Sequence, residues 1–185
     1  MQRSWWNMNA SLDSSAITSD ELVGALDALG VHFLAGGAQT ARALALSPAE
    51  LLLGLARDAD ARVRLAVIPL LLCHPEYAEY APSVAAQLAG DAKLTFQCYY
   101  TAAYWLQRKY AKALAKLVGA VQPLLDLFSA GLEAHSDETA PDRALALLSR
   151  RHQILSGEPI NWRGTYEHAA QCLLKQLTRE KLWAT

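Results

Sequence analysis

Residues 56–66 have the sequence Ala-Arg-Asp-Ala-Asp-Ala-Arg-Val-Arg-Leu-Ala, and this segment constrains the fold of the chain more than any other. Two acidic residues, Asp58 and Asp60, follow a leucine-rich stretch and precede a second apolar stretch that opens at Val63. Aspartate is favoured at the position that caps a helix N-terminus. We therefore expect one helix to end near Asp58 and an antiparallel partner to begin at Asp60 after a tight turn.

Signals of the same kind divide most of the chain into helices. Ser47, Pro48 and Glu50 form the sharpest start signal, because the serine caps the helix and the glutamate reaches back to the cap amide. Pro69 is expected to kink the helix that begins at Asp60. The expected helices cover residues 19–35, 48–57, 60–71, 75–90, 92–118, 141–155 and 162–182. The polar residues 1–18 are expected to form a flexible tail, and residues 19–185 a single all-α domain.

Two helix pairs in the middle of the chain share one layout. The Leu-Ala-Arg of residues 55–57 and the Leu-Ala-Gly of residues 88–90 lie 33 positions apart. Asp60 and Asp91, each expected to cap the next helix, lie 31 positions apart. Periods of this size are typical of helical solenoids, so the pattern predicts a stack of about eight helices in antiparallel pairs.

The acidic turn and the helix after it resemble the HEAT repeat, which favours Asp in the turn and Val-Arg in the second helix, as at Val63 and Arg64. The resemblance covers residues 48–106, and the second copy has Leu94 and Thr95 in place of Val-Arg. It implies a HEAT-like α–α superhelix. The chain is also similar to bacterial helical proteins with His-Pro-Glu, Tyr-Tyr-Thr-Ala-Ala and Thr-Tyr-Glu-His-Ala-Ala segments, some of them encoded beside nucleotidyltransferase-like genes. This second resemblance implies another bacterial protein, of nucleotidyltransferase-like type, as a partner.

The composition favours a large core and disfavours nucleic-acid binding. Hydrophobic residues make up 52 % of the chain and charged residues 19 %, so most helices are expected to have two buried neighbours. The formal net charge of −1 lacks the basic excess that phosphate contacts require. The longest apolar run, residues 65–73, is too short to span a membrane, and polar residues interrupt any signal-peptide core near the N-terminus. We therefore expect a cytoplasmic protein without membrane contact.

A stretch rich in aromatic and basic residues, 96–112, offers the best candidate interaction surface. Aromatic side chains supply much of the binding energy in protein interfaces. Packing in the core is the explanation for one side of this helix, which carries Phe96, Tyr99, Ala103, Leu106 and Tyr110. The basic residues at its end either complement the helix dipole or bind an acidic protein segment or a phosphate. The primary hypothesis is therefore a non-catalytic protein-interaction module. Its predicted partner-binding residues are Arg62, Arg64, Tyr100, Tyr104, Trp105, Arg108, Lys109 and Lys112.

Residues 163–168, Arg-Gly-Thr-Tyr-Glu-His, match the Arg-x4-His spacing of HEPN-type ribonucleases. This resemblance implies RNA cleavage by Arg163 and His168, usually across the interface of a homodimer. Gly164 departs from the polar residue that the family has after the arginine. A continuous helix also places side chains five positions apart about 140° from each other around its axis. An ordinary surface pair between Arg163 and Glu167 is the alternative.

A HEAT-like DNA glycosylase is a third hypothesis, because that fold can cup a duplex. It requires a concave basic face with an acidic residue and a tryptophan at its centre. His32, His135 and His152 have no neighbour at metal-ligand spacing, and the sequence contains no Gly-rich phosphate loop or nucleophile elbow. The sequence therefore predicts no metal site and no cofactor.

Overall fold

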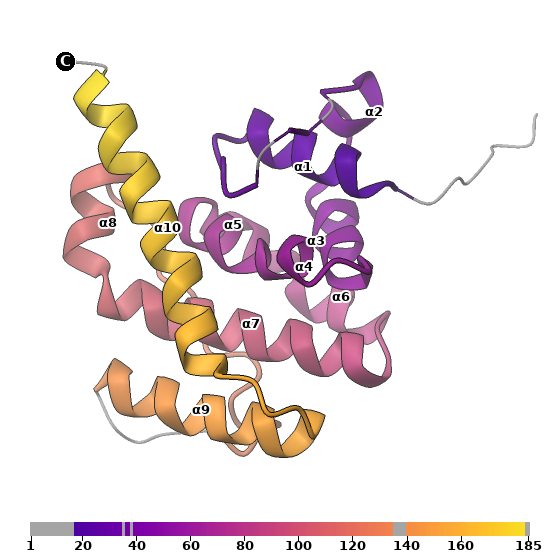
Figure 1. Cartoon of the computed structure of the whole chain (residues 1–185), viewed down its shortest axis with the longest axis vertical. Helices are drawn as coiled ribbons and strands as arrows, with labels where there is room; N and C mark the ends of the chain where they lie inside the picture. Colours follow the sequence, from indigo (N-terminus) through magenta and orange to yellow (C-terminus); the bar gives the residue numbers. More distant parts are fainter. Residues whose placement is uncertain (1–16, 35, 38, 135–139, 184–185) are drawn as a thin grey trace, which may run out of the picture.

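The computed structural model describes residues 17–34, 36–37, 39–134 and 140–183. Within these ranges all regular secondary structure is helical and no β-strand occurs (Figure 1), which confirms the all-α prediction. The helices are α1 (Ser19–Ala28), α2 (Ala41–Leu44), α3 (Pro48–Arg57), α4 (Ala61–Leu65), α5 (Val67–Cys73), the 3₁₀ helix η1 (Pro75–Tyr80), α6 (Ala81–Ala86), α7 (Gly90–Lys109), α8 (Ala111–Val118), α9 (Pro141–Ser156) and α10 (Trp162–Trp183). Residues 1–16, most of the expected tail, lie outside the described ranges.

Reciprocal capping hydrogen bonds start two of the N-terminal helices. The Thr18 hydroxyl accepts from the Glu21 amide at 3.3 Å, and the Glu21 carboxylate accepts from the Thr18 amide at 2.9 Å. Ser47 and Glu50 repeat this arrangement at the start of α3, with the same two distances. Each pair satisfies amides that have no partner inside the helix. The predicted start of α3 is therefore confirmed.

The acidic turn between α3 and α4 has the predicted position and a defined hydrogen-bond pattern. The Asp58 carboxylate accepts from the Asp60 amide at 2.7 Å. The Asp60 carboxylate in turn accepts from the Arg62 amide at 2.8 Å and caps α4. Two short side chains thus bind the amides of the turn itself, which fixes the path of the backbone between the two helices.

Pro69 divides the helix that follows the turn. The helix axis breaks at Ala66, between α4 and α5. Proline has no N–H to donate, and its ring clashes with the carbonyl four positions earlier, which belongs to Leu65 at the end of α4. The structure therefore shows an interruption of this helix at Ala66, three residues before Pro69.

Two helices end earlier than the sequence pattern predicts. α1 ends at Ala28, and Gly30 then adopts a φ of +73°, a left-handed conformation that favours glycine. The long helix expected over 92–118 is interrupted at Tyr110 and forms α7 and α8.

The expectation that Asp91 caps this helix is also wrong, because Ala89 occupies the cap position and Asp91 lies in the first turn. Asp91 therefore complements the helix dipole but does not repeat the role of Asp60.

α7 runs through the centre of the molecule (Figure 1). It packs against α3, α5, α9 and α10, and every residue from Cys98 to Gln107 is buried. A helix that is buried on all sides needs neighbours all round, and the helices before and after it supply them. α10 runs past α9, α7, α5 and α8 and so connects the C-terminal helices to the N-terminal part of the fold.

α9 and α10 have the boundaries that the sequence predicts to within one residue. Gly157 ends α9 with a φ of +71°, and a short loop leads to Trp162 at the start of α10. The Asn161 side chain accepts from the Gly164 amide at 3.0 Å, which satisfies one of the first amides of α10. The loop 157–161 is therefore held at both ends.

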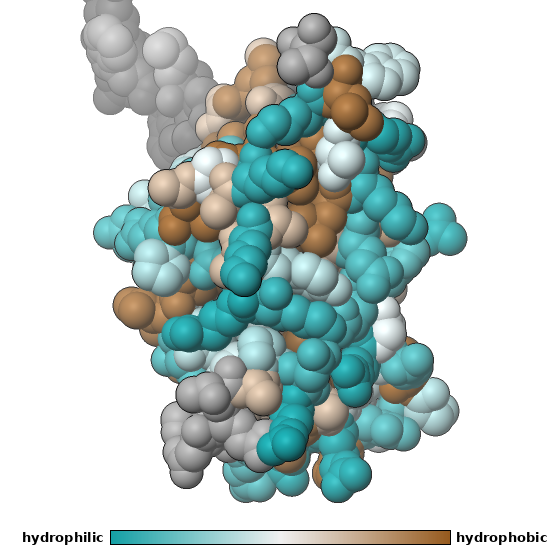
Figure 2. Space-filling view, turned by 90° about the vertical axis from the view of Figure 1, so that its left-hand side faces the viewer, coloured by the Kyte–Doolittle hydropathy of each residue, from teal (hydrophilic) through white to brown (hydrophobic). Residues whose placement is uncertain are grey.

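The face that carries α8 is mostly hydrophilic (Figure 2). Hydrophobic side chains gather towards the top of that view, where α10 ends. Leu182 and Trp183 are exposed at this end of α10. None of the helices in the described ranges has the length and apolar character needed to cross a membrane.

Candidate partner-binding groove

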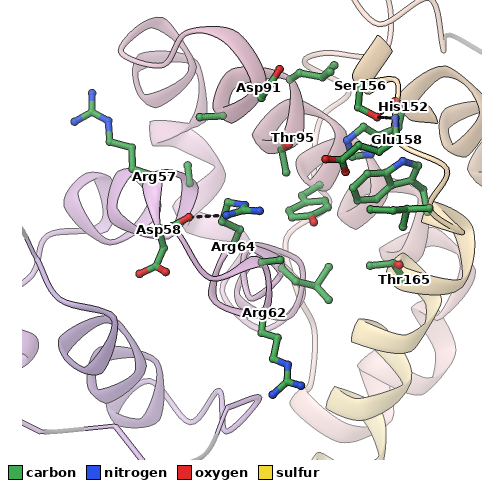
Figure 3. A pocket seen from close by; sticks show the side chains of 18 residues that line it. Arg57, Asp58, Arg62, Arg64, Asp91, Thr95, His152, Ser156, Glu158 and Thr165 are labelled. Carbon is green, nitrogen blue, oxygen red and sulfur yellow. Dashed lines mark hydrogen bonds between the residues drawn. The ribbon is translucent and has the colours of Figure 1, made fainter. Parts of the chain in front are cut away.

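A cavity of about 590 Å³ lies where the N-terminal and C-terminal parts of the fold meet (Figure 3). One wall is formed by the α3–α4 turn and α4, and the first turns of α7 contribute to it. The other wall is formed by the end of α9, the loop 157–161 and the first turn of α10. Ligand sites in proteins commonly have volumes of about 300–1,000 Å³. We call this cavity the Arg64 groove.

Arg64 is the basic side chain that points into the groove, whereas the guanidinium groups of Arg57 and Arg62 point away from it (Figure 3). The Nη1 group of Arg64 donates to the backbone oxygens of Asp58 at 2.7 Å and of Ala59 at 2.8 Å. Both acceptors belong to the acidic turn, so the turn that joins α3 and α4 also orients this guanidinium. The Nε and Nη2 groups have no hydrogen-bond partner within the described ranges.

An aromatic cluster closes the wall formed by α9 and α10. The His152 ring stacks on Trp162, with 3.7 Å between the ring centroids and 19° between the planes. His152 Nδ1 and the Tyr166 hydroxyl lie 2.6 Å apart in a buried hydrogen bond. Tyr99 of α7 packs edge-on against His152 and Tyr166. These contacts hold the loop 157–161 against α7.

His152 is a neutral residue in this environment. Burial lowers the pKa of its imidazole from 6.5 to about 4. Its Nε2 atom and the Nε1 atom of Trp162 are buried and have no hydrogen-bond partner among the residues that the structure describes. Two such atoms in adjacent side chains are uncommon, because an unpaired buried polar group costs about 1–3 kcal/mol. These two unpaired atoms therefore lower the stability of the folded protein beside the groove.

Further polar groups face the groove without a partner. The Tyr99 hydroxyl and the Glu158 and Asp91 carboxylates make no hydrogen bond or ion pair within the part of the chain described. Burial raises the pKa of Tyr99 to about 12, while the Arg64 charge lowers it and the Glu158 charge raises it. Arg64 and Glu158 thus both act electrostatically on the Tyr99 hydroxyl, which stays protonated at neutral pH. The groove therefore presents the Arg64 guanidinium, the Tyr99 hydroxyl and the Glu158 and Asp91 carboxylates among its polar groups.

The predicted partner-binding residues do not form one surface. Arg62 and Arg64 line the groove, whereas Tyr100, Tyr104 and Trp105 are buried. The Tyr100 hydroxyl donates to the backbone oxygen of Leu125 at 3.1 Å, inside the molecule. These aromatic side chains therefore pack in the core, although the sequence pattern assigns a core role only to the neighbouring side of the helix.

The basic residues at the end of α7 have mixed environments. The Arg108 guanidinium lies 4.4 Å from the centroid of the Tyr104 ring, and Lys112 is exposed on α8. Lys109 Nζ binds the carboxylates of Glu167 at 2.5 Å and Asp142 at 2.8 Å. Lys109 therefore joins α7 to α9 and α10 within the chain.

Arg163 and His168 lie on α10, in its first two turns. Because Arg163 is the second residue of that helix, the two side chains point about 140° apart around the axis and do not converge within one chain. Arg163 donates to the Asp142 carboxylate at 3.0 Å, and His168 Nε2 lies 3.4 Å from Cys172 Sγ. Cleavage of RNA across a homodimer stays a prediction.

The sequence pattern does not identify His152, Trp162 and Glu158 as members of the site. The spacing of His152 from the other histidines gives no support for a role as a metal ligand. Within the described ranges no three His, Cys, Asp or Glu side chains are placed to hold a metal ion, and His135 lies outside those ranges. The available signal was the loop of residues 157–161, which has Gly, Pro and Asn between two long helices.

Comparisons of the chain with protein-family models, with curated proteins and with solved structures find no match.

Proposed function

We propose that this protein is a non-catalytic protein-interaction module, and that a segment of a partner protein binds in the Arg64 groove. One observation carries the proposal. The Arg64 guanidinium lines a cavity of about 590 Å³, and the backbone oxygens of the acidic turn orient it. The unpartnered groups of Tyr99 and Glu158 line the same cavity. Pre-oriented polar groups in a concave site reduce the cost of ordering on binding.

The surroundings of the groove favour a macromolecular partner. Ile154, Leu155 and Ile160 are 61 %, 45 % and 41 % exposed at the end of α9 and in the loop that forms one wall. Ile160 lines the groove, and exposed apolar side chains beside a cleft are typical of protein interfaces. A small ligand inside the groove would leave this apolar surface uncovered, whereas a polypeptide that extends past the rim can bury it.

The other functional hypotheses receive less support from the geometry. The ribonuclease requires Arg163 and His168 at one phosphate, and Arg163 is engaged by Asp142. The DNA glycosylase requires a concave basic face. The groove has Trp162 in its wall, but acidic side chains stand beside the arginines there, and a phosphate backbone would meet repulsion from them.

The proposal also covers the type of helix pair in the fold and the class of protein that binds to it. We interpret α3 and α4 as one HEAT-like pair, which the acidic turn and the Val63-Arg64 dipeptide support. The partner is another bacterial protein, and the sequence resemblance makes a nucleotidyltransferase-like protein the first candidate.

Affinity capture from the native host with matched variants tests the proposal. Ile160→Asp places a charge at the apolar rim of the groove, and Leu44→Asp places the same charge on α2, where Leu44 is 59 % exposed and does not line the groove. We expect the wild type and Leu44→Asp to retain one stoichiometric protein partner, and Ile160→Asp to lose it. Equal retention by all three proteins, or co-purified RNA in place of a protein, would contradict the proposal.

A further inference from the structure

We propose that the segment of the partner protein that binds in the Arg64 groove carries an aspartate or glutamate whose carboxylate pairs with Arg64. This inference rests on the proposed function and specifies the chemistry of the segment. Three features of the groove support it: the geometry of the Arg64 guanidinium, the charges opposite this group and the apolar wall beside it.

The first step is the orientation of the guanidinium. Its Nη1 group has two N–H bonds, and the oxygens of Asp58 and Ala59 accept them. The remaining edge consists of Nε–H and one N–H of Nη2, which are parallel and about the width of a carboxylate. Because the opposite edge is anchored, little side-chain entropy remains to be lost when this edge binds a ligand. The structure thus presents a pre-oriented two-pronged donor for a carboxylate.

The charges opposite Arg64 disfavour anions of higher charge than a carboxylate. The unpartnered carboxylates of Glu158 and Asp91 line the same groove as Arg64. They repel a phosphate group or a nucleic-acid backbone, whose charges accumulate along the chain. A single carboxylate meets weaker repulsion from Glu158 and Asp91 than a phosphate does, because it carries less charge, and Arg64 supplies its charge partner. The charges that line the groove therefore accommodate one acidic side chain on an otherwise neutral or basic segment and disfavour a phosphorylated or polyanionic ligand.

The third step concerns the residues next to the carboxylate. Leu65, Leu94 and Ile160 line the groove together with the indole of Trp162. An apolar or aromatic side chain beside the acidic residue can cover these groups, and each buried aromatic or aliphatic anchor adds to affinity. The expected recognition pattern is one acidic residue flanked by an apolar one.

Selection from a phage-displayed library of random peptides tests the inference with the full-length protein. The wild type is compared with Arg64→Gln and with Arg62→Gln, which removes the same charge from an exposed side chain that points away from the groove. We expect the peptides selected by the wild type and by Arg62→Gln to be enriched in Asp or Glu, and those selected by Arg64→Gln to lack this enrichment.

A second measurement changes the peptide, so its main comparison uses the wild-type protein. In the tightest peptide, replacement of the acidic residue by its amide is expected to weaken binding to the wild type about ten-fold or more, and binding to Arg64→Gln about two-fold or less. Thermal unfolding of Arg64→Gln shows whether its fold is retained. If the amide peptide binds the wild type as well as the acidic peptide does, the inference fails.

The outcomes also separate this inference from the proposed function. Selected peptides that Ile160→Asp no longer binds, but that lack an acidic residue, overturn the inference and leave the interaction module intact. If no peptide binds, if binding is insensitive to Ile160→Asp, or if a random single-stranded RNA binds more tightly than every peptide, both proposals are wrong.

Discussion

The imidazole ring of His152 lies flat against the indole of Trp162, with centroids 3.7 Å apart. His152 belongs to α9 and Trp162 is the first residue of α10, so this stack joins the two helices directly across the loop 157–161. Tyr166, one turn further along α10, shares a hydrogen bond with His152 Nδ1. The three rings fix the loop that forms one wall of the Arg64 groove.

The buried His152 predicts a loss of stability in mild acid. Its folded pKa of about 4 lies below the ordinary value of 6.5, so the unfolded chain binds the proton more readily between these two values. Its contribution is therefore fully present above pH 6.5 and decreases as the pH falls towards 4. We expect urea denaturation to give about 2 kcal/mol less stability from this group at about pH 5 than at about pH 7.5. His152→Gln should lack this part of the pH dependence, and an unchanged profile in that variant would contradict the assignment.

Removal of the Tyr166 hydroxyl is expected to destabilise the protein. Tyr166→Phe leaves His152 Nδ1 without its partner at 2.6 Å, in addition to the unpaired Nε2. The expected decrease in the free energy of unfolding is about 1–2 kcal/mol. The matched control is Tyr80→Phe, at an exposed tyrosine, for which we expect a change within about 0.5 kcal/mol. A comparable effect of both substitutions in chemical denaturation would argue against the buried hydrogen bond.

Glu167 is predicted to stabilise the contact between α7 and α10. Its carboxylate binds Lys109 Nζ at 2.5 Å and accepts from the Tyr110 hydroxyl at 2.8 Å, and all three side chains are partly buried. Glu167→Gln should lower the free energy of unfolding by about 1–2 kcal/mol, between the values typical of exposed and fully buried pairs. Glu79→Gln, at an exposed glutamate, serves as the control in the same denaturation experiment. A loss no larger than that of the control would show that the network contributes nothing to stability.

The capping box of α3 gives a prediction with a conservative rescue. Ser47→Ala removes the acceptor for the Glu50 amide and is expected to cost about 1 kcal/mol of stability. Ser47→Thr keeps a hydroxyl at the same position and should retain most of it. Thermal unfolding of both variants checks the prediction, which requires the alanine variant to be the less stable of the two.

Local signals in the sequence explain how much of the fold could be predicted. The starts of α3 and α4 follow from Ser47 and Asp60, because a cap acts within three residues of the chain. The break before α5 follows from Pro69 in the same way. The boundaries of α9 and α10 likewise depend on Pro141 and Gly157, residues with a strong effect on their own neighbourhood.

The candidate site could be predicted only in part, because packing between distant segments creates it. Arg64 follows the aspartate turn directly, so its place on α4 is predictable, whereas His152 and Glu158 reach the groove through the packing of α9 on α7. The burial of Tyr100 and Trp105 also depends on the neighbours that surround α7 on all sides. Helical spacing predicts one buried face and does not reveal that a helix lies in the centre of the fold.

Site-specific photo-crosslinking in the native host shows whether a partner protein occupies the Arg64 groove. A photoreactive residue is introduced at position 160, at the rim of the groove, or at position 44, on α2 outside it. If a partner protein binds in the groove, position 160 crosslinks to one partner protein and position 44 does not. If Arg64 pairs with this partner, Arg64→Gln abolishes the crosslink and Arg62→Gln preserves it. A partner that crosslinks from position 44 alone would contradict binding in the groove. A crosslink at position 160 that Arg64→Gln leaves unchanged would contradict the pairing of the partner with Arg64.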